Sequence, residues 1–473
     1  MTSEARISSA TSVKGVGLKS GTSKAKARRR RGSGGRGTGR LRGKRVRKLR
    51  LRRRRRMGRG QLRLRRRLRG KGQRARLRAR RRRKALPVVE AAPPPPPPPP
   101  EPEEPGYRRG VNIVGFVRAE MGIGESSRLA ARSLDAAGIP FDMMNFPITK
   151  IRMEDLTWAH KEVEHPDFKA NVFHMNADTM RSVHHYFGQG LFDGRRNIGY
   201  WHWELPDFPD EFCNGFELVD EVWVPSNYVV NCIAPKSPVP VIRIPHGIEV
   251  HYPPGLNRGS FGLPGDRFLF FSMFDTLSYQ RRKNPQGAIA AFKMAFDPND
   301  ASVGLVVKLN HSQANPDDLE RLHQQVQGFS NIYILDQIMT RGEVNALLAC
   351  TDSFVSLHRA EGFGLGLAEA MYLGKPVIGT HWSGNTDFMN ASNSCPIGFS
   401  LVQVGEDWGP YKSYQTWAEP DLEHAAHSMR EVRFNEAFRM DIAARGQATI
   451  RGEFSPAAVG NRMRIRLKEL GVL

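Results

Sequence analysis

Cysteine is scarce in this 473-residue sequence, and its four cysteines lie far apart without any Cys-x-x-Cys pair. We therefore expect reduced, mostly buried thiols and neither a structural metal site nor a disulfide framework. The sequence also has no run of about 18 apolar residues, so no membrane-spanning helix is expected. The basic N-terminus lacks an apolar core and a small-residue cleavage site, which excludes a recognisable secretory signal.

Acidic and aromatic residues are almost absent from residues 1–86. This segment has 37 Lys and Arg residues against the single acid Glu4, and it has no Phe, Tyr or Trp. Because like charges repel and little apolar surface offsets chain entropy, we expect a disordered leader. The leader could bind a polyanion such as an anionic membrane surface, but without aromatic stacking no sequence-specific nucleic-acid binding is expected. Translation of GC-rich DNA upstream of a true start, for example at Met57, would give the same composition, and both interpretations stay open.

Residues 87–106 form a Pro-rich linker, in which Pro93–Pro100 predicts a stiff polyproline II spacer. The remaining residues, 107–473, carry 35 basic and 42 acidic side chains, so the net charge of +25 comes from the leader. The folded part of the chain is therefore mildly acidic.

Residues 107–473 alternate short apolar runs with amphipathic helical stretches. Val111–Val117 is typical of a buried parallel strand, and the same rhythm restarts at Arg267–Phe274. This alternation predicts an α/β fold with two doubly wound, Rossmann-like sheets on either side of residue 255. Ligands of such sheets bind outside the carboxyl ends of the strands, so we expect one cleft between two facing lobes.

The segment His358–Pro376 reads as a strand end, a glycine loop and a helix from about Gly364. A helix N-terminus after such a loop offers unpaired N–H groups and a positive dipole end, which suit a diphosphate. Glu361 in the loop and Glu369 on the helix would repel phosphates. We therefore expect the two carboxylates to contact neutral hydroxyls. One carboxylate would contact hydroxyls of a donor sugar, and the other would contact hydroxyls of a ribose.

In this strand–loop–helix context, the Glu361-x7-Glu369 spacing resembles the signature of the retaining family-4-type GT-B glycosyltransferases. The alternative is that Glu361 and Glu369 are two surface acids beside a structural glycine turn. The resemblance covers nearly all of residues 107–473. It includes the segments Gly199–Pro209, Asp220–Tyr228, Ile244–Val250 and Arg281–Lys293.

The resemblance implies roles for the residues of the glycine loop. Glu361 would contact hydroxyls of the donor sugar, and Glu369 would contact the ribose hydroxyls. Gly362, Phe363 and Gly364 would present backbone N–H groups to the sugar or the phosphates.

The resemblance also places Lys283 on the donor diphosphate, where a cation would stabilise the charge that grows on the leaving group. A solvated loop lysine is the alternative. The family's Gly-Arg pair before this lysine is replaced here by residues 272–275, which contain no base. Arg281 or Arg282 could substitute for it, and we assign Arg282 to donor binding. Gly384 could add a backbone donor to the phosphates or belong to an ordinary turn.

In the first lobe, His202 follows a predicted strand, where many members of the family carry a cleft histidine. It could hydrogen-bond the donor sugar or help to position the acceptor, and a packed core histidine is the alternative. Gly122 and Gly124 resemble the family's acceptor-side glycine loop. By themselves they are a poor dinucleotide motif, because the third glycine of the pattern is Ser127 here.

No Asp-x-Asp pair and no His/Cys cluster with metal-ligand spacing occur in residues 107–473. We therefore expect a metal-independent site without a cofactor, in which a nucleotide diphosphate sugar is a co-substrate.

The resemblance implies transfer of a hexosyl group from a nucleotide diphosphate sugar to a hydroxyl of a glycan or lipid-linked acceptor, with retention. The expected setting is cell-surface polysaccharide or glycolipid assembly in the cytoplasm, or peripherally on the inner face of a bacterial membrane. The predicted domains are an acceptor-side domain (107–255), a donor-binding domain (256–454) and a C-terminal helix that braces the first domain (455–473).

Two kinds of alternative stay open. The chain could be another GT-B enzyme, either a sugar-nucleotide epimerase or a phosphorylase with a pyridoxal-phosphate lysine. It could also be a polyanion-binding protein that acts through its Arg-rich leader.

Overall fold

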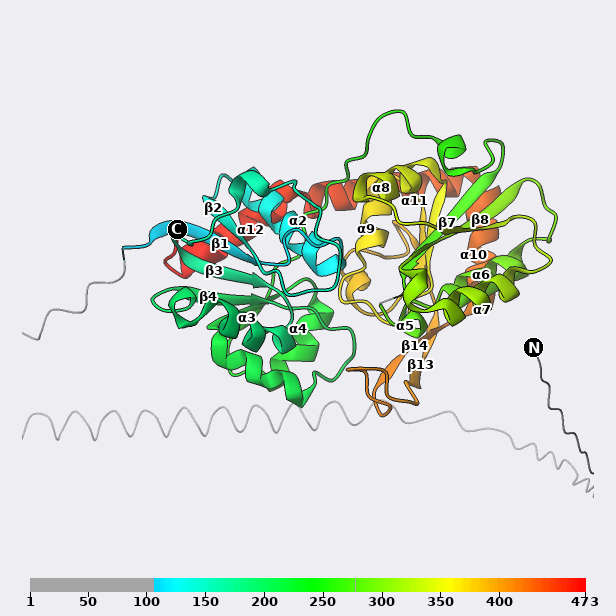
Figure 1. The fold of residues 1–473 in the computed structure, drawn as a ribbon. Helices are drawn as coiled ribbons and strands as arrows, with labels where there is room; N and C mark the ends of the chain where they lie inside the picture. The colour runs from blue at the N-terminus through cyan, green and yellow to red at the C-terminus, as the bar shows by residue number, and fades with distance from the viewer. Residues whose placement is uncertain (1–105, 277) are drawn as a thin grey trace, which may run out of the picture. The chain divides into compact units, whose positions relative to one another are not determined.

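The computed structural model describes residues 106–276 and 278–473 of the chain. The predicted leader (1–86) and residues 87–105 of the predicted linker lie outside the described residues. The described part contains two six-stranded parallel sheets, one after the other along the chain (Figure 1). No helix of this part is both long enough and apolar enough to cross a membrane.

The first sheet has the strand order β2-β1-β3-β4-β5-β6. Alternate side chains of a strand point to opposite faces, so both faces of this sheet need a cover of helices. Helices α2 and α12 pack on one face and helices α3 and α4 on the other. The bounds are β1 Arg108–Gly115, α2 Gly122–Ala136, β2 Phe141–Asn145, β3 Phe168–His174, α3 Met180–Phe187, β4 Arg196–Tyr200, β5 Glu221–Val224, α4 Asn227–Ile233 and β6 Val241–Arg243.

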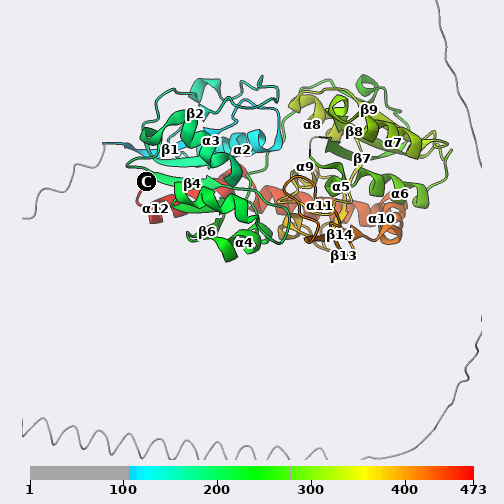
Figure 2. The same ribbon diagram turned by 60° about the horizontal axis from the view of Figure 1, so that its bottom comes forward.

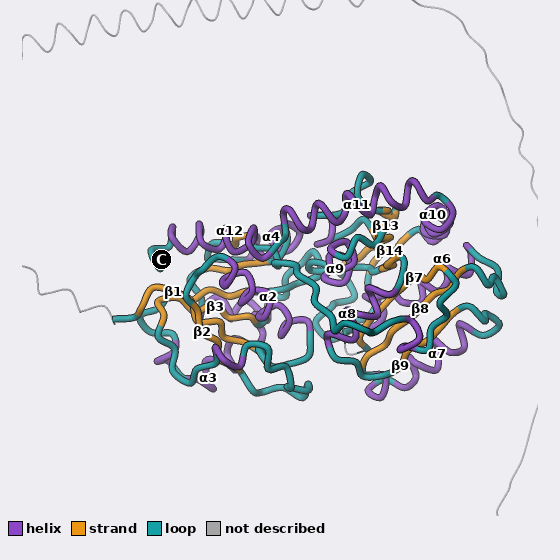
Figure 3. Tube along the Cα trace, turned by 90° about the horizontal axis from the view of Figure 1, so that it is seen from above, coloured by secondary structure: helices purple, strands orange, loops and turns teal. Residues whose placement is uncertain are grey.

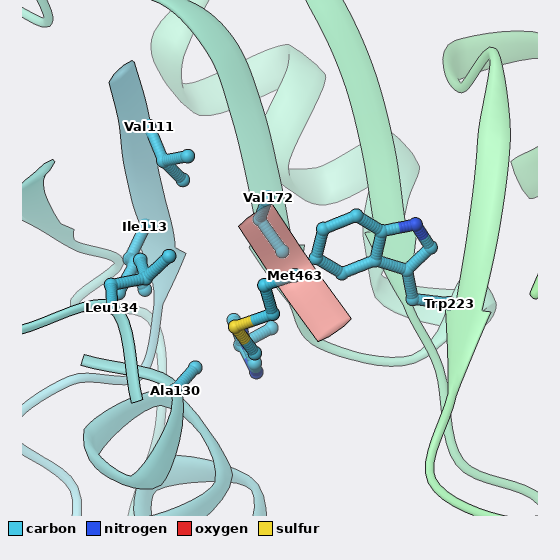
Figure 4. Close-up of a pocket in the computed structure, with 8 residues that line it drawn as sticks. Val111, Ile113, Ala130, Leu134, Val172, Trp223 and Met463 are labelled. Carbon is cyan, nitrogen blue, oxygen red and sulfur yellow. The ribbon is translucent and has the colours of Figure 1, made fainter. Parts of the chain in front are cut away.

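Figure 4 shows where α2, α12 and the first sheet meet. Val111 and Ile113 of β1, Leu134 of α2 and Met463 of α12 surround a cavity of about 10 Å³. This volume has room for one water molecule at most and its lining is almost entirely apolar, so the cavity is a packing gap and not a ligand site.

The second sheet has the order β12-β11-β10-β7-β8-β9. Helices α8 and α9 pack on one face, and α6, α7 and α10 on the other. The bounds are β7 Phe268–Asp275, α5 Gln280–Lys283, α6 Pro285–Ala295, β8 Val303–Asn310, α7 Pro316–Val326, β9 Ile332–Asp336, α8 Arg341–Cys350, β10 Ser353–Ser356, α9 Leu365–Tyr372, β11 Val377–Thr380, β12 Cys395–Ile397 and α10 Leu422–Phe434.

An antiparallel hairpin, β13 Phe399–Gln403 and β14 Thr416–Pro420, lies outside both parallel sheets (Figure 2). The chain then ends with α11 Glu436–Glu453 and α12 Pro456–Glu469, which follow one another along the same side of the molecule (Figure 3). Helix α11 packs against α9 of the second lobe, whereas α12 packs against α2 of the first. A Cβ atom on Gly460 of α12 would lie 2.0 Å from the carbonyl oxygen of Ser133, so only glycine allows this close approach.

Both sheets have the crossover pattern of doubly wound folds, which confirms the predicted fold class. In the first sheet the winding reverses between β1 and β3, and in the second between β7 and β10. Ligands of such sheets bind at these reversals, outside the carboxyl ends of the strands. The segments that follow β1, β3, β7 and β10 are therefore where a site is expected.

Local signals in the sequence mark several helix ends. The Asn284 side chain caps α6, with Pro285 at the first helical position, and Thr340 and Glu343 form a capping box at the start of α8. The two glycines of the expected acceptor-side loop, Gly122 and Gly124, lie in α2, which begins at Gly122. Met121 has the extended backbone of an N-cap, so these glycines belong to the first helical turn.

Candidate functional site

The N-terminus of α9 lies at the carboxyl end of β10 and has no side-chain cap. Gly364 is its N-cap and has φ +95°, a left-handed conformation that favours glycine. Among the described residues, the backbone N–H groups of residues 362–367 have no acceptor. Six unpaired donors near the positive end of a helix dipole are the kind of group that binds anions.

Glu361 lies directly before these donors and is ion-paired with two cations from the segment after β7. Lys283 Nζ donates to Glu361 Oε1 at 2.6 Å, and Arg282 Nη1 lies 3.5 Å from Glu361 Oε2. Burial alone would raise the pKa of Glu361, but Lys283 and Arg282 lower it to about 2. The carboxylate is therefore ionised at neutral pH and acts as a hydrogen-bond acceptor.

The strained turn at Asn284 brings these two cations to the site. Asn284 has φ +51°, and its side-chain Nδ2 donates to the carbonyl of Leu357, just after β10, at 2.8 Å. A non-glycine residue in this conformation costs free energy and persists only where the surroundings fix it. The contact fixes the end of α5, and with it Lys283, beside the loop that carries Glu361.

Glu369 lies in α9 with its side chain only 3% exposed, and Arg341 of α8 pairs with its Oε1. Its Oε2 is buried and has no hydrogen-bond partner among the described residues. A buried acceptor without a partner costs free energy, so a donor group from a ligand would stabilise it. A hydroxyl group fits this oxygen better than a phosphate, which would be repelled.

Arg341 also faces Glu125 of α2, in the first lobe. Burial raises the pKa of Glu125, while the charges of Arg341, Arg128 and Arg132 lower it to about 2. The charged network therefore continues from α9 to the start of α2, where Gly122 and Gly124 lie. A Cβ atom on Gly124 would lie 2.2 Å from the Ala119 carbonyl oxygen, so this position requires glycine.

His202 follows β4 in the first lobe and lies against the glycine loop of the second lobe. A Cβ atom on Gly362 would lie 3.9 Å from the Cβ of His202. The flanking Trp201 and Trp203 are buried, whereas His202 is half-buried and its Nδ1 has no partner in the described part of the chain. His202 therefore lies at the boundary between the lobes and not in the core of one of them.

Two further histidines extend this contact, and the sequence pattern alone did not indicate them. The rings of His202 and His246 are stacked with their Nε2 atoms 3.3 Å apart, and His246 packs edge-on against Phe363 at 5.0 Å. His174, at the end of β3, pairs with Ser126 at 3.1 Å. Burial lowers the pKa of His202 to about 4 and that of His174 to about 3, so both are neutral at pH 7.

The structure bears on two assignments to the phosphate region, that of Gly384 and that of Arg281 or Arg282. The Gly384 N–H donates to the carbonyl of Glu361 at 2.8 Å, so it is not a free donor here, and the assignment of Gly384 to the phosphates is corrected to support of the loop. Of the two arginines offered as substitutes, Arg281 pairs with Glu406 away from Glu361, whereas Arg282 is buried beside it. Arg282 is therefore the one placed in the site.

Within residues 106–276 and 278–473, no group of three or more His, Cys, Asp or Glu side chains could hold a metal ion. In the described part of the chain, the cations paired with Glu361 and Glu369 are the side chains of Lys283, Arg282 and Arg341. The sequence pattern did not indicate Arg341, because it lies in an otherwise ordinary capping box.

Comparisons with known proteins match this chain to glycosyltransferases. Residues 260–400, which include Lys283, Glu361 and Glu369, match the family model described as Glycosyl transferases group 1. A search of curated proteins finds no match to the sequence.

Solved structures resemble the chain over most of its length. HepE of Anabaena, in complex with UDP and glucose, is 13% identical with a TM-score of 0.55, over 76% of this chain and 100% of that chain. Sucrose-phosphate synthase from Thermosynechococcus elongatus is 16% identical with a TM-score of 0.56, over 77% and 99%. A glycosyltransferase from Rickettsia africae is 13% identical with a TM-score of 0.54, over 77% and 99%. At these identities the similarity shows the fold, which is GT-B.

Proposed function

We propose that this chain is a retaining hexosyltransferase of the group 1 type, which moves a sugar from a nucleotide diphosphate sugar to an acceptor hydroxyl. One observation carries the proposal. The unpaired N–H groups of residues 362–367 lie between the partly buried carboxylate of Glu361 and the buried carboxylate of Glu369, in the segment that matches the glycosyltransferase family. This arrangement combines donors for a diphosphate with acceptors for neutral hydroxyls.

The diphosphate would lie on the N-terminus of α9, with Lys283 beside it. As the glycosidic bond breaks, negative charge grows on the leaving diphosphate, and the helix dipole and Lys283 would stabilise that charge without a metal ion. Lys283 pairs with Glu361 in this structure, so its ammonium group would be shared between the carboxylate and the incoming phosphate.

The two carboxylates would orient the neutral parts of the donor. Glu361 would accept hydrogen bonds from hydroxyls of the sugar, and the free Oε2 of Glu369 would accept one from the ribose. Arg341 holds Oε1 of Glu369, so Oε2 is preorganised for the ligand. Lys283 and Arg282, in contrast, hold the two oxygens of Glu361 and orient that carboxylate. The transition state would have oxocarbenium character, as in glycoside hydrolysis.

The first lobe would present the acceptor. His202 is neutral at pH 7 and lies against the glycine loop, where a hydrogen bond to the donor sugar or the acceptor hydroxyl is within reach. We propose a glycan or lipid-linked acceptor, in cell-surface polysaccharide or glycolipid assembly on the cytoplasmic side of a membrane. This setting follows from the family resemblance of the motifs.

Thermal-shift screening of the full chain tests the proposal. The ligands are UDP-glucose, GDP-mannose, ADP-glucose and TDP-glucose, each at several concentrations. A donor at 100 times its Kd should stabilise the protein by about 2.7 kcal/mol, which is easily measured. If no sugar nucleotide shifts the unfolding transition of a folded sample, the proposal is wrong.

Incubation with the identified donor also separates the alternatives. A transferase consumes the donor only when an acceptor hydroxyl or water is present, whereas an epimerase would convert the donor to another sugar nucleotide without an acceptor. NMR spectroscopy of the anomeric proton distinguishes these products and reports whether the configuration is retained.

A further inference from the structure

The hairpin formed by residues 399–420 connects the second lobe to the first beside the proposed site. It contains β13, β14 and the connection 404–415 between them (Figures 1 and 2). Two tyrosines of this connection donate hydrogen bonds to acids that follow β4. Tyr411 Oη donates to Glu204 Oε2 at 2.9 Å, and Tyr414 Oη donates to Asp207 Oδ2 at 2.6 Å.

These two contacts differ in how exposed the tyrosine is and in which residues lie next to the contact. Tyr411 is 5% exposed, and its ring packs against Trp203 with centroids 5.6 Å apart. Tyr414 is 61% exposed, and Asp207 also pairs with Lys236 at the surface. Only the Tyr411 contact continues inward to the residues of the site.

Arg282 lies between two carboxylates, one from each lobe. Its Nη2 is 3.7 Å from Glu204 Oε1, and its Nη1 is 3.5 Å from Glu361 Oε2. Its guanidinium also lies 5.9 Å from the centre of the Tyr411 ring. Glu204 and Glu361 therefore share one buried cation through its two terminal nitrogens, and a shift of Glu204 toward Arg282 would change how the cation is shared.

We propose that Tyr411 is a positioning residue: its hydroxyl holds Glu204, and so leaves Arg282 to orient Glu361 toward the donor sugar. Without this hydrogen bond Glu204 is free to close the 3.7 Å separation and draw the guanidinium away from Glu361. The inference rests on the proposed function, because it assigns the effect to the sugar part of the donor. The nucleoside diphosphate binds on the N–H groups of α9, beside Lys283 and on Glu369, and none of these groups contacts Arg282 directly.

The experiment measures the affinity of the full chain for a sugar nucleotide and for its diphosphate by isothermal titration calorimetry. The probes are the four sugar nucleotides of the thermal-shift screen, with UDP, GDP, ADP and TDP. Tyr411→Phe keeps the ring and removes the hydroxyl. It should weaken binding of the sugar nucleotide about tenfold, the value of one buried hydrogen bond, and change binding of the diphosphate less than about twofold.

Tyr414→Phe is the control, since it removes a hydroxyl of the same hairpin that also donates to an acid after β4 but has no link to Arg282. It should leave both affinities unchanged. The double variant Tyr411→Phe/Glu204→Gln should recover most of the lost affinity for the sugar nucleotide, because an uncharged residue does not compete for Arg282. The ratio of the two affinities is taken within one protein, so a smaller folded fraction changes both alike.

Three results separate the hypotheses. If both tyrosine variants lower the affinities for the sugar nucleotide and for the diphosphate equally, the hairpin only joins the lobes, and the inference is overturned. An unchanged affinity ratio in Tyr411→Phe, or no recovery in the double variant, would also overturn it while the proposed function stands. If the wild-type chain binds none of the sugar nucleotides, the proposed function itself fails.

Discussion

At the scale of single residues, the contact between Lys283 and Glu361 joins the segments that follow β7 and β10. These are the two strands between which the winding of the second sheet reverses. The contact places a cation beside six unpaired N–H groups and keeps an ionised carboxylate next to them. A positive and a negative group at one helix N-terminus can bind a ligand that has both phosphates and hydroxyls.

Lys283→Met should reduce kcat by about 10²- to 10³-fold, because it removes a preplaced cation from the leaving group. The measurement is steady-state turnover of the donor found by thermal-shift screening. Lys293→Met is the control, since Lys293 lies on α6 and donates to the carbonyl of Gln325. Equal turnover by the Lys283 variant and the wild type would contradict the assigned role.

The buried histidines predict how stability depends on pH. Burial lowers the pKa of His174 to about 3, against a usual value of about 6.5 in the unfolded chain. Between these values the unfolded chain binds a proton that the folded one does not, so stability falls as the pH falls below about 6.5. The slope should be about 1.4 kcal/mol per pH unit for each buried histidine.

Denaturant unfolding between pH 7.5 and 5 measures this slope in the wild type and in His174→Asn. The variant should show a smaller slope, whatever its stability at pH 7.5. Identical slopes in the two proteins would mean that His174 is already protonated in the folded state.

At the scale of elements, the glycine loop and α9 form the centre of the site. Gly364 has φ +95°, and a Cβ atom there would lie 3.2 Å from the Cβ of Asn385. Gly364→Ala should therefore destabilise the protein by about 1–2 kcal/mol and weaken donor binding, because the loop must change conformation.

Gly452→Ala is the comparison for that variant. Gly452 lies in α11, and a methyl group added there would meet no atom within 4 Å, so alanine should raise stability by up to about 1 kcal/mol. Thermal unfolding and donor titration of both variants give the comparison. Unchanged donor binding in Gly364→Ala would show that the loop does not hold the ligand.

Sequence reasoning worked best for elements with local signals. The caps at Asn284 and Thr340 and the left-handed Gly374 after α9 depend on neighbours within a few residues, so the sequence around each of them is enough to locate it. Strand β2 was missed, since Phe141–Asn145 is short and mixes polar and apolar residues. The hairpin 399–420 was also missed, because Tyr411 and Trp417 are buried against a lobe that is distant in sequence.

The residues of the candidate site also divide into those with a local sequence signal and those that depend on tertiary contacts. The helix N-terminus, Glu361 of the glycine loop and Glu369 of α9 could be proposed from the sequence because they lie within one short segment, and their roles stay predictions. Arg341 and Tyr411 could not, because each acquires its role from a partner in another lobe or helix. Gly384 was assigned to the phosphates from its position after a strand. The hydrogen bond that occupies its N–H depends on tertiary structure alone.

At the scale of the whole molecule, the described residues contain two sheets and their covering helices, and the proposed site lies where the lobes meet. Removal of residues 1–105 should therefore leave donor turnover within about twofold of the full chain, since no residue of the site lies there. Turnover by both forms at equal concentration is the measurement. Loss of activity in a folded truncated protein would favour the alternative in which the Arg-rich leader is the functional part.

The central claim is that the start of α9 binds the diphosphate while Glu361 and Glu369 bind neutral hydroxyls. A crystal structure of the protein with its sugar nucleotide tests this most directly. The account predicts phosphate oxygens on the N–H groups of residues 362–367, with a sugar hydroxyl on Glu361 and a ribose hydroxyl on Glu369. A nucleotide bound elsewhere, with both carboxylates still paired only to Lys283, Arg282 and Arg341, would contradict it.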